Sequence, residues 1–341
     1  MTRLITSESN IRYLSGFTGS VGILIIKDNT SILIVDGRYT EQAGSEVKKG
    51  IKVMETPLSS GLLDTAIDLI KSKKPSNIGY EDDKMDAASF NKLKDRFPNA
   101  KFYSISKELR DLRMIKGRDE IDVIRKAALI ADLTYDCVIH IIKPGMTELE
   151  LSAHIDFLMK TFKASSPAFE TLVSSGKLSA YPHGKPADKK LNKGDLIVMD
   201  FGARYKGYNS DVTRMVSLGA PSKKQRMIYD AVLSAQGSAI AKVRHGIAAK
   251  DVDKAARNVL KKEKLDKYFS HGTGHGIGLQ VHEGPRVSLS SKDILKEGMV
   301  ITVEPGVYIP GLGGFRVEDM VLVKKSGCEV LTKSSKALAV L

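Results

Sequence analysis

The chain has 341 residues, which is enough for two domains of ordinary size and too many for a single small core. Its 42% apolar and 27% charged residues are the balance of a globular protein and exclude a fibrous or largely disordered chain. The formal net charge of +13 raises the question of a nucleic-acid partner. The lysines are dispersed and have no interleaved aromatic side chains, so we expect solvated lysine faces and no nucleic-acid partner.

Short apolar runs alternate with helical patterns over roughly the first 110 residues. Residues 21–26 and 31–35 have the pattern of apolar strands joined by a short polar turn. Further strand patterns cover residues 3–6, 51–54, 77–80 and 101–105, and helical patterns cover residues 62–72 and 87–97. Strands that alternate with helices predict an α/β domain with a mostly parallel or mixed sheet.

A charged and weakly patterned stretch, residues 106–117, separates this region from a long helical pattern. From Ile121 to Ile142, apolar residues follow one another at steps of three and four, which places them on one face of a helix. Such a stripe is typical of plain core packing. We therefore predict two domains, residues 1–110 and 111–341.

The remainder of the second domain combines helices with strands and glycine-rich loops. Thr147, with Glu150 three residues later, has the pattern of a capping box that begins a helix. Strand patterns then cover residues 196–203, 208–216, 300–307 and 315–323, and helical patterns cover residues 228–243 and 249–262. The chain as a whole is expected to have an α+β fold.

The first of the strand pairs carries two aspartates. A hairpin with a two-residue turn between Arg204 and Gly207 places Asp200 directly opposite Asp211. Side chains opposite each other in this way have Cβ atoms roughly 5 Å apart. We therefore expect two carboxylates to face each other across this hairpin.

The second strand pair carries Glu304 and Glu318 symmetrically about Gly311, so these carboxylates are also expected to face each other. Like charges opposite one another destabilise a sheet, and two such pairs require a compensating cation. Hard oxygen ligands suit divalent metal ions, and a carboxylate can bridge two of them. The residues therefore predict a metal site in the second domain.

Four of the seven histidines lie in polar or glycine-rich segments and are candidates for the same site. They are His183, His271, His275 and His282. The other three are expected to be ordinary packing or surface residues, and they are His140, His154 and His245. Glycines around the second and third candidates allow the backbone to approach a site closely. The sequence contains no zincin, dinucleotide-binding, P-loop or nucleophile-elbow motif.

The ordered motifs of the chain resemble the pita-bread metallopeptidases of the M24 group, in the branch of Xaa-Pro aminopeptidases and prolidases. The matching strings are PHG at 182–184, MDFG at 199–202, SDVTR at 210–214, HGTGHGIGL at 271–279, VHEGP at 281–285, EPGVY at 304–308 and FRVED at 315–319. In the first half, NIRYLSGFTGS at 10–20 and DGRYTEQA at 36–43 are similar to the creatinase-type N-terminal domain of this branch.

The resemblance implies a C-terminal pita-bread catalytic domain of the creatinase/aminopeptidase type, preceded by a smaller creatinase-like α/β domain. The family's leading helix is expected to be missing, because residues 3–6 already have the pattern of the first strand. Met215 stands where the family usually has threonine, outside the implied ligand set.

The resemblance also implies five metal ligands, which fall on Asp200, Asp211, His275, Glu304 and Glu318. Asp211 and Glu318 would bridge two metals, Asp200 would chelate one of them, and the remaining two ligands would hold the other. The expected cofactor is two divalent metal ions per subunit. Four carboxylates and one imidazole suit manganese, cobalt or zinc, and we expect manganese.

Four residues are expected to take part in catalysis by the same resemblance. Glu304 would carry a proton from the attacking water to the departing nitrogen, and His282 would polarise the carbonyl or stabilise the intermediate. His183 would line the pocket, with a structural role as the alternative. Arg316 would either orient substrate or pair with a ligand carboxylate. His271 is expected to support the site without binding metal.

The function implied is metal-dependent hydrolysis of the bond between an N-terminal residue and proline. An Xaa-Pro aminopeptidase is the first interpretation, an Xaa-Pro dipeptidase (prolidase) is the alternative, and a non-catalytic pita-bread binding protein is a remote third. A homodimer is expected by resemblance. The absence of a long apolar run or signal-peptide pattern, together with only two cysteines, leads us to expect a cytoplasmic protein with no membrane partner.

Overall fold

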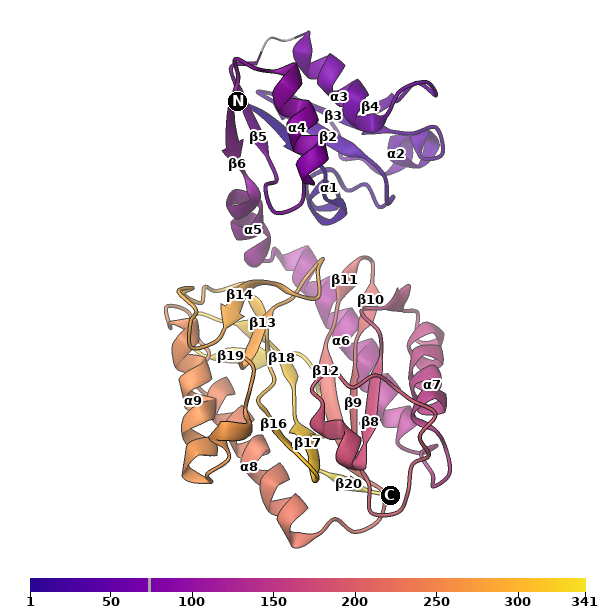
Figure 1. Cartoon of the computed structure of the whole chain (residues 1–341), viewed down its shortest axis with the longest axis vertical. Helices are drawn as coiled ribbons and strands as arrows, with labels where there is room; N and C mark the ends of the chain where they lie inside the picture. Colours follow the sequence, from indigo (N-terminus) through magenta and orange to yellow (C-terminus); the bar gives the residue numbers. More distant parts are fainter. Residues whose placement is uncertain (73–74) are drawn as a thin grey trace. The chain divides into compact units, whose positions relative to one another are not determined.

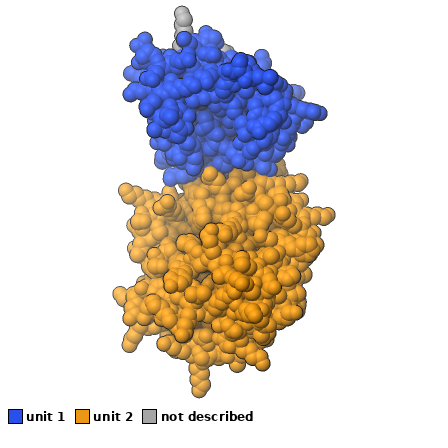
Figure 2. Space-filling view, turned by 45° about the vertical axis from the view of Figure 1, so that its right-hand side comes forward, with its two compact units in different colours: residues 1–113 blue, residues 114–341 orange. Residues whose placement is uncertain are grey.

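The computed structural model describes residues 1–72 and 75–341, so the lysines at positions 73 and 74 lie outside the described residues. The chain forms two compact units, residues 1–113 and 114–341 (Figure 2). The predicted division after residue 110 falls inside a helix, α5 (Ser106–Met114). Across the described part of the chain, no helix is both long and apolar enough to cross a membrane.

The first unit is built on one six-stranded mixed sheet with the strand order β4-β3-β2-β1-β5-β6 (Figure 1). Its strands are β1 (Thr2–Ile5), β2 (Ile23–Lys27), β3 (Thr30–Val35), β4 (Ile51–Glu55), β5 (Asn77–Tyr80) and β6 (Lys101–Ser104). The pairs β1–β2 and β2–β3 are antiparallel, and the other three pairs are parallel. The predicted α/β domain with a mixed sheet is therefore confirmed.

Helices cover both faces of this sheet because successive residues of each strand point to opposite sides. Leu4 and its same-face neighbours pack against α3 (Leu62–Lys71) and α4 (Ala87–Arg96). Ile5 and the alternate residues pack against the other helices, which are α1 (Glu8–Ser15), α2 (Thr40–Glu46) and α5.

Sequence patterns predicted α3 and α4 but not the three helices on the opposite face. These three are short or strongly polar, and each contributes few apolar side chains to the core. In α5, Leu109 packs into the core while charged residues occupy most other positions. A helix of this kind owes its stability to tertiary packing more than to its own periodicity.

The second unit contains two larger sheets, with the orders β20-β12-β9-β8 and β14-β13-β15-β18-β19, and two smaller ones, β11-β10-β7 and β16-β17. The strands of its first half are β7 (Ser166–Pro167), β8 (Leu172–Ser175), β9 (Leu196–Phe201), β10 (Ala203–Tyr205), β11 (Tyr208–Asn209) and β12 (Val212–Ser217). Those of its second half are β13 (Gly274–Gly276), β14 (Glu283–Val287), β15 (Val300–Val303), β16 (Gly306–Ile309), β17 (Gly313–Arg316), β18 (Asp319–Val323), β19 (Cys328–Val330) and β20 (Ala339–Val340).

Two pairs of long helices cover the outside of these sheets (Figure 1). They are α6 (Arg118–Val138) with α7 (Glu148–Thr161), and α8 (Lys223–Ile240) with α9 (Ala249–Lys262); two short 3₁₀ turns, η1 (Gly176–Ala180) and η2 (Asp266–Tyr268), lie in loops. The predicted stripe is buried along α6, although this helix ends before Ile142. The predicted capping box of Thr147 and Glu150 is present at the start of α7.

The register of the β9–β12 hairpin differs from the prediction. Asp200 pairs with Thr213, so Asp211 lies diagonally across from Asp200 and not directly opposite. The reason is the turn: Lys206 and Gly207, with φ of 45° and 81°, are its two central residues. Two-residue hairpin turns of this type need positive φ at both positions, which glycine adopts freely. The prediction had placed Gly207 outside the turn.

The register of the second strand pair follows the prediction. Val303 of β15 pairs with Asp319 of β18, and Gly306 of β16 pairs with Arg316 of β17. Glu304 and Glu318 lie between these two paired segments in the same register, where the ladder is interrupted. The predicted symmetry about Gly311 is therefore confirmed.

Candidate metal centre

Three of the predicted ligands form a compact cluster in the second unit. One ligand atom each from Asp211, His275 and Glu318 lies within 4.8 Å of the other two. Glu304 adjoins this cluster, because its Oε1 lies 3.4 Å from Nε2 of His275. The same nitrogen lies 3.6 Å from Oδ2 of Asp211. Side chains from four different strand regions therefore converge on one point.

These predicted ligands lie where strands begin, end or are interrupted. Asp211 precedes β12, Glu304 follows β15, and Glu318 precedes β18, whereas His275 lies in the short strand β13. β13 approaches β15 closely because of Gly274, where an added Cβ would lie 2.1 Å from the Thr302 carbonyl oxygen. The glycine-rich string thus allows the imidazole to reach the carboxylates.

The imidazole of His275 is oriented for metal binding. Its Nδ1 lies 3.0 Å from the carbonyl oxygen of Gly276, which accepts a hydrogen bond only if Nδ1 carries the proton. Nε2 is then left with its lone pair facing the carboxylates. Burial lowers the pKa of His275, so the ring is neutral near pH 7. A neutral imidazole fixed through its second nitrogen is the form that binds metal.

Asp200, the fifth predicted ligand, contacts Arg316 through Oδ2. Its other oxygen, Oδ1, is buried and has no hydrogen-bond partner among the described residues. A buried carboxylate oxygen without a partner carries a desolvation penalty that a cation would remove.

The four carboxylates are costly to ionise together. Burial raises the pKa of all four, and Glu318 and Asp200 raise the pKa of Asp211 further. For Glu304 the result is a pKa of about 7. The one guanidinium of Arg316 offsets this repulsion in part and leaves an excess of negative charge that divalent cations can balance.

The donor set therefore fits divalent metal ions. It combines carboxylate oxygens with one neutral imidazole nitrogen, a mixture that suits manganese, cobalt and zinc better than soft-metal ions. The unpartnered oxygen of Asp200 points to the same conclusion independently of the cluster distances. Of the predicted ligands, Asp211, His275, Glu304 and Glu318 each have an atom within 4.8 Å of an atom of another.

Two threonines that no sequence motif predicted hold carboxylates of the cluster in place, and each lies two residues from a predicted ligand. Thr213 donates from Oγ1 to Oε2 of Glu318 at 2.8 Å. Thr302 donates to Oε1 of Glu304 at 3.3 Å and accepts from the backbone N–H of His275. A period of two places such neighbours on the same strand face, which is the signal that could have found them.

Arg316 contacts one predicted ligand and three further groups. It pairs with Asp200, donates from Nε to Oγ1 of Thr213 at 2.9 Å, and donates to the hydroxyl of Tyr308 at 2.8 Å. The same guanidinium reaches the carbonyl oxygen of Pro182 at 3.2 Å. Pairing with the carboxylate of Asp200, a predicted ligand, is thus observed, and a role of Arg316 in orienting substrate stays a prediction.

His271 and Arg316 both contact the hydroxyl of Tyr308. Its Nε2 is 3.0 Å from the Tyr308 hydroxyl, and its Nδ1 is 2.8 Å from the Gly272 carbonyl oxygen. Burial lowers the pKa of His271 to about 4, so it stays neutral. Arg257 of α9 donates to the His271 carbonyl oxygen and fixes the segment.

The remaining two predicted catalytic histidines are exposed. The ring of His282 lies 4.4 Å from that of His275, measured between centroids, so it borders the ligand cluster. His183 follows Pro182, whose carbonyl accepts from Arg316. Both are therefore near the cluster and open to solvent, a placement suited to side chains that meet a substrate.

A buried ion pair anchors the strand that follows His282. Nζ of Lys116 lies 2.6 Å from Oε1 of Glu283, and their side chains are 1% and 2% exposed. The two residues are 167 positions apart, so the sequence offers no local signal for the pair. The backbone N–H of Lys116 also donates a hydrogen bond to the carbonyl oxygen of Gly298.

We expect Lys116→Met to destabilise the protein by about 3–5 kcal/mol, because it leaves the Glu283 carboxylate buried without its lysine. The double variant Lys116→Met/Glu283→Leu is expected to recover most of this loss, since it removes both charges. Urea unfolding followed by circular dichroism measures both changes. Equal destabilisation in the single and double variants would contradict this account.

The raised carboxyl pKa values predict how stability depends on pH. Between the unfolded-state values near 4 and the folded value of about 7 for Glu304, the folded metal-free protein binds more protons than the unfolded chain. Its stability therefore falls as pH rises through this window, by about 3 kcal/mol for Glu304 alone. Metal ions replace these protons, so stabilisation by Mn²⁺ should grow with pH.

Thermal unfolding with EDTA and with Mn²⁺ at pH 5.5, 6.5, 7.5 and 8.0 measures this effect. The difference in Tm between the two series is expected to increase steadily with pH. A difference that stays constant or shrinks toward pH 8 would show that the carboxylates do not exchange protons for metal.

Comparison with known families agrees with this geometry. The model for metallopeptidase family M24 matches residues 122–325, and the model for the creatinase/prolidase N-terminal domain matches residues 2–115. The chain belongs to metallopeptidase family M24. It is therefore a metallopeptidase with a creatinase-type N-terminal domain and a pita-bread catalytic domain, as the motifs implied.

Relatives of this M24 peptidase match it over nearly its whole length. An Xaa-Pro dipeptidase of Pyrococcus horikoshii is 39% identical, covering 98% of this chain and 93% of the relative. The structure of an X-Pro aminopeptidase from Thermotoga maritima is 37% identical with a TM-score of 0.92, covering 100% of this chain and 97% of its own. An Xaa-Pro dipeptidase from Bacillus anthracis is also 37% identical, with a TM-score of 0.95 and coverage of 100% and 95%.

Proposed function

We propose that this M24 peptidase hydrolyses the bond between an N-terminal residue and proline, using two divalent metal ions. The observation that carries the proposal is the convergence of Asp211, His275 and Glu318 within 4.8 Å, with Glu304 beside them. The names of its relatives, which include Xaa-Pro dipeptidases and an X-Pro aminopeptidase, support the substrate class.

In this proposal five side chains hold the two metals. Asp211 and Glu318 would be shared by both ions, as the motif resemblance implies, and they lie in one cluster with His275. Asp200, whose Oδ1 has no hydrogen-bond partner among the described residues, would help to hold one ion, and Glu304 with His275 would help to hold the other. Manganese is the proposed metal, with cobalt and zinc as alternatives that the same donors accept.

Two bound divalent ions supply a strong nucleophile from water near neutral pH and polarise the scissile carbonyl. Glu304 would take a proton on a carboxylate oxygen and pass it to the departing proline nitrogen. Thr302 donates to Oε1 and so orients this carboxylate.

The exposed histidines are proposed to meet the substrate. Partial burial of the ring and the neighbouring His275 lower the pKa of His282, so the ring is neutral near pH 7 and can donate a hydrogen bond to the developing oxyanion. His183 lines the pocket on the side of Pro182. Arg316, held by Asp200, Thr213 and Tyr308, keeps a fixed position from which it orients the substrate backbone.

Dipeptides and longer peptides are both supported as substrates. The motifs favour the aminopeptidase as the first interpretation, and the name of the Thermotoga maritima relative also favours it. The names of the Pyrococcus horikoshii and Bacillus anthracis relatives favour the dipeptidase. We further propose a cytoplasmic homodimer whose two domains divide near residue 110.

Product release from Ala-Pro and Ala-Pro-Ala tests the proposal, with Ala-Ala as a control lacking proline. The protein is first treated with chelator, and manganese, cobalt or zinc is then added back. Cleavage of the tripeptide before proline would assign an aminopeptidase, and cleavage of Ala-Pro alone would assign a dipeptidase. Failure on both, with metal shown to be bound, would overturn the proposed substrate and favour a non-catalytic binding protein.

A further inference from the structure

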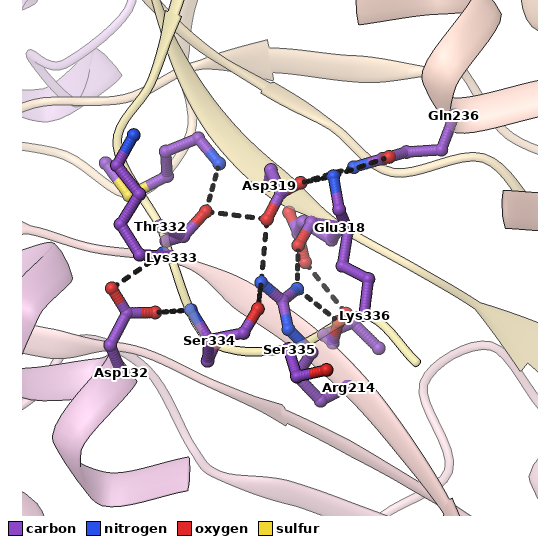
Figure 3. A network of polar contacts seen from close by, with 12 residues as sticks. Asp132, Arg214, Gln236, Glu318, Asp319, Thr332, Lys333, Ser334, Ser335 and Lys336 are labelled. Atoms are coloured by element: carbon purple, nitrogen blue, oxygen red, sulfur yellow. Dashed lines mark hydrogen bonds and ion pairs between the residues drawn. The ribbon is translucent and has the colours of Figure 1, made fainter. Parts of the chain in front are cut away.

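A buried polar network lies beside the strands that carry Asp211 and Glu318 (Figure 3). At its centre are Arg214 of β12 and Asp319 of β18, whose side chains are 1% and 0% exposed and whose charged atoms lie 2.7 Å apart. Both residues directly adjoin proposed metal-holding segments, yet neither has a role in the chemistry proposed above.

The guanidinium of Arg214 joins three separate segments of the chain. One of its terminal nitrogens donates to the carbonyl oxygens of Thr213 and Glu318. The other donates to Oδ1 of Asp319 at 2.7 Å and to the carbonyl oxygen of Ser334 at 3.1 Å. A single side chain thus links β12, the start of β18 and a segment close to the C-terminus.

The carboxylate of Asp319 is in turn held on both oxygens. Thr332 donates to Oδ1 at 2.8 Å, while Gln236 of α8 and Lys336 donate to Oδ2 at 2.8 and 2.6 Å. Thr332 and Lys336 are the first and last residues of the segment that also contains Ser334, whose carbonyl oxygen accepts from Arg214. The ion pair is therefore tied to a helix and to residues 332–336 as well as to its own strands.

Asp132 of α6 fixes the same C-terminal segment from a different helix. Its two oxygens accept from the backbone N–H groups of Lys333 and Ser334, at 2.7 and 2.8 Å (Figure 3). Asp132 is itself buried. The segment that holds Arg214 is thus anchored and is not a free tail.

Two adjacent residues of β12 donate hydrogen bonds to Glu318, one to its side chain and one to its main chain. Thr213 donates to the side-chain oxygen Oε2 at 2.8 Å, and Arg214 donates to the main-chain oxygen. Because neighbouring residues of a strand point to opposite faces, these contacts lie on opposite sides of the sheet. Asp211 lies two residues before Thr213, on the same face as Thr213.

We propose that Arg214, with Asp319 and residues 332–336, is a positioning network that fixes the spacing between Asp211 and Glu318 and so sets the affinity for metal. The inference rests on the proposed metal centre. Repulsion between the two buried carboxylates would spread the strands in the metal-free protein, and the arginine holds their backbones together. Partners outside the ligand set commonly change metal affinity by about 10–100-fold when they are lost.

The test compares Arg214→Lys with wild type by calorimetric titration of chelator-treated protein with Mn²⁺. Lysine keeps a positive charge beside Asp319 but cannot reach both carbonyls, because it lacks the planar fork of arginine. We expect Kd for Mn²⁺ to rise about 10–100-fold while the circular dichroism spectrum is unchanged. Arg125→Lys is the matched control, because Arg125 pairs with Asp122 and Glu329 on the surface, and its Kd should not change.

A folded Arg214→Lys protein that binds Mn²⁺ as tightly as wild type would overturn the proposal. If that variant does not fold, Arg214→Met/Asp319→Leu replaces the ion pair with apolar groups, an exchange that buried pairs often tolerate. Unchanged Mn²⁺ affinity in this variant would also overturn it, and a 10–100-fold loss would support it.

Hydrogen exchange of the metal-free wild type adds a readout without substitution, with slow exchange expected at residues 212–214 and 318–320. Rapid amide exchange at these residues would contradict the proposal that the spacing between Asp211 and Glu318 is fixed before metal binds. Wild type that binds no Mn²⁺ would instead refute the proposed function.

Discussion

Alanine at Asp211 or Glu318 is expected to abolish metal binding and peptidase activity together. Each residue contributes a ligand atom to the three-residue cluster, and each is proposed to bridge both metals. Loss of a bridging carboxylate removes a contact to both ions, so kcat/KM should fall at least about 10³-fold. Metal content by mass spectrometry and turnover of Ala-Pro or Ala-Pro-Ala measure the two effects. Asp230→Ala, at an exposed carboxylate of α8, is the matched control.

The same variants should be more stable than wild type when metal is absent. Burial and neighbouring carboxylates raise the pKa of Asp211, which shows that its charged form is disfavoured in the folded protein. Removing it relieves repulsion, and the Tm in EDTA at pH 8 is expected to rise. Stability given up for function in this way is common at active sites. Full metal binding by either variant would contradict the ligand assignment.

His282→Ala is expected to keep the metal ions but lose turnover by about 10²–10³-fold. The ring borders His275 at 4.4 Å between centroids, yet it is exposed, so it is placed to donate to the substrate. Its loss should remove the proposed stabilisation of the developing oxyanion and leave the five proposed metal ligands unchanged. Mn²⁺ titration and kcat with the preferred peptide separate these effects.

His154→Ala provides the control for this substitution, because His154 is an exposed histidine on α7. Near-normal kcat in His282→Ala would show that the proposed role is wrong. A loss of metal together with activity would show instead that His282 supports the ligand cluster.

Local patterns in the sequence were sufficient for much of the fold. The alternation of strands and helices gave the mixed sheet of the first unit, and the symmetry about Gly311 gave the correct register for Glu304 and Glu318. The hairpin at Lys206 and Gly207 shows the limit of such reasoning. Which two residues occupy the turn depends on the conformation that glycine permits, and displacing the turn by one residue changed every pair in the hairpin.

The contacts that hold the site together join residues that are far apart in the sequence, so local patterns do not predict them. Lys116 meets Glu283 across 167 positions, and Arg214 meets the Ser334 carbonyl across 120. Neither pair has a periodic signal, because the contact exists only once the strands and the C-terminal segment have packed. Spacing in the sequence can therefore suggest ligands, whereas the residues that orient them require the structure.

The most direct test of the metal centre is a crystal structure of the Mn²⁺-loaded protein with anomalous diffraction data collected at the manganese absorption edge. Our account predicts two anomalous peaks in each chain. One should lie between Asp200 and the bridging carboxylates, and the other between His275, Glu304 and the same carboxylates. A single peak, or two peaks away from Asp211 and Glu318, would contradict it.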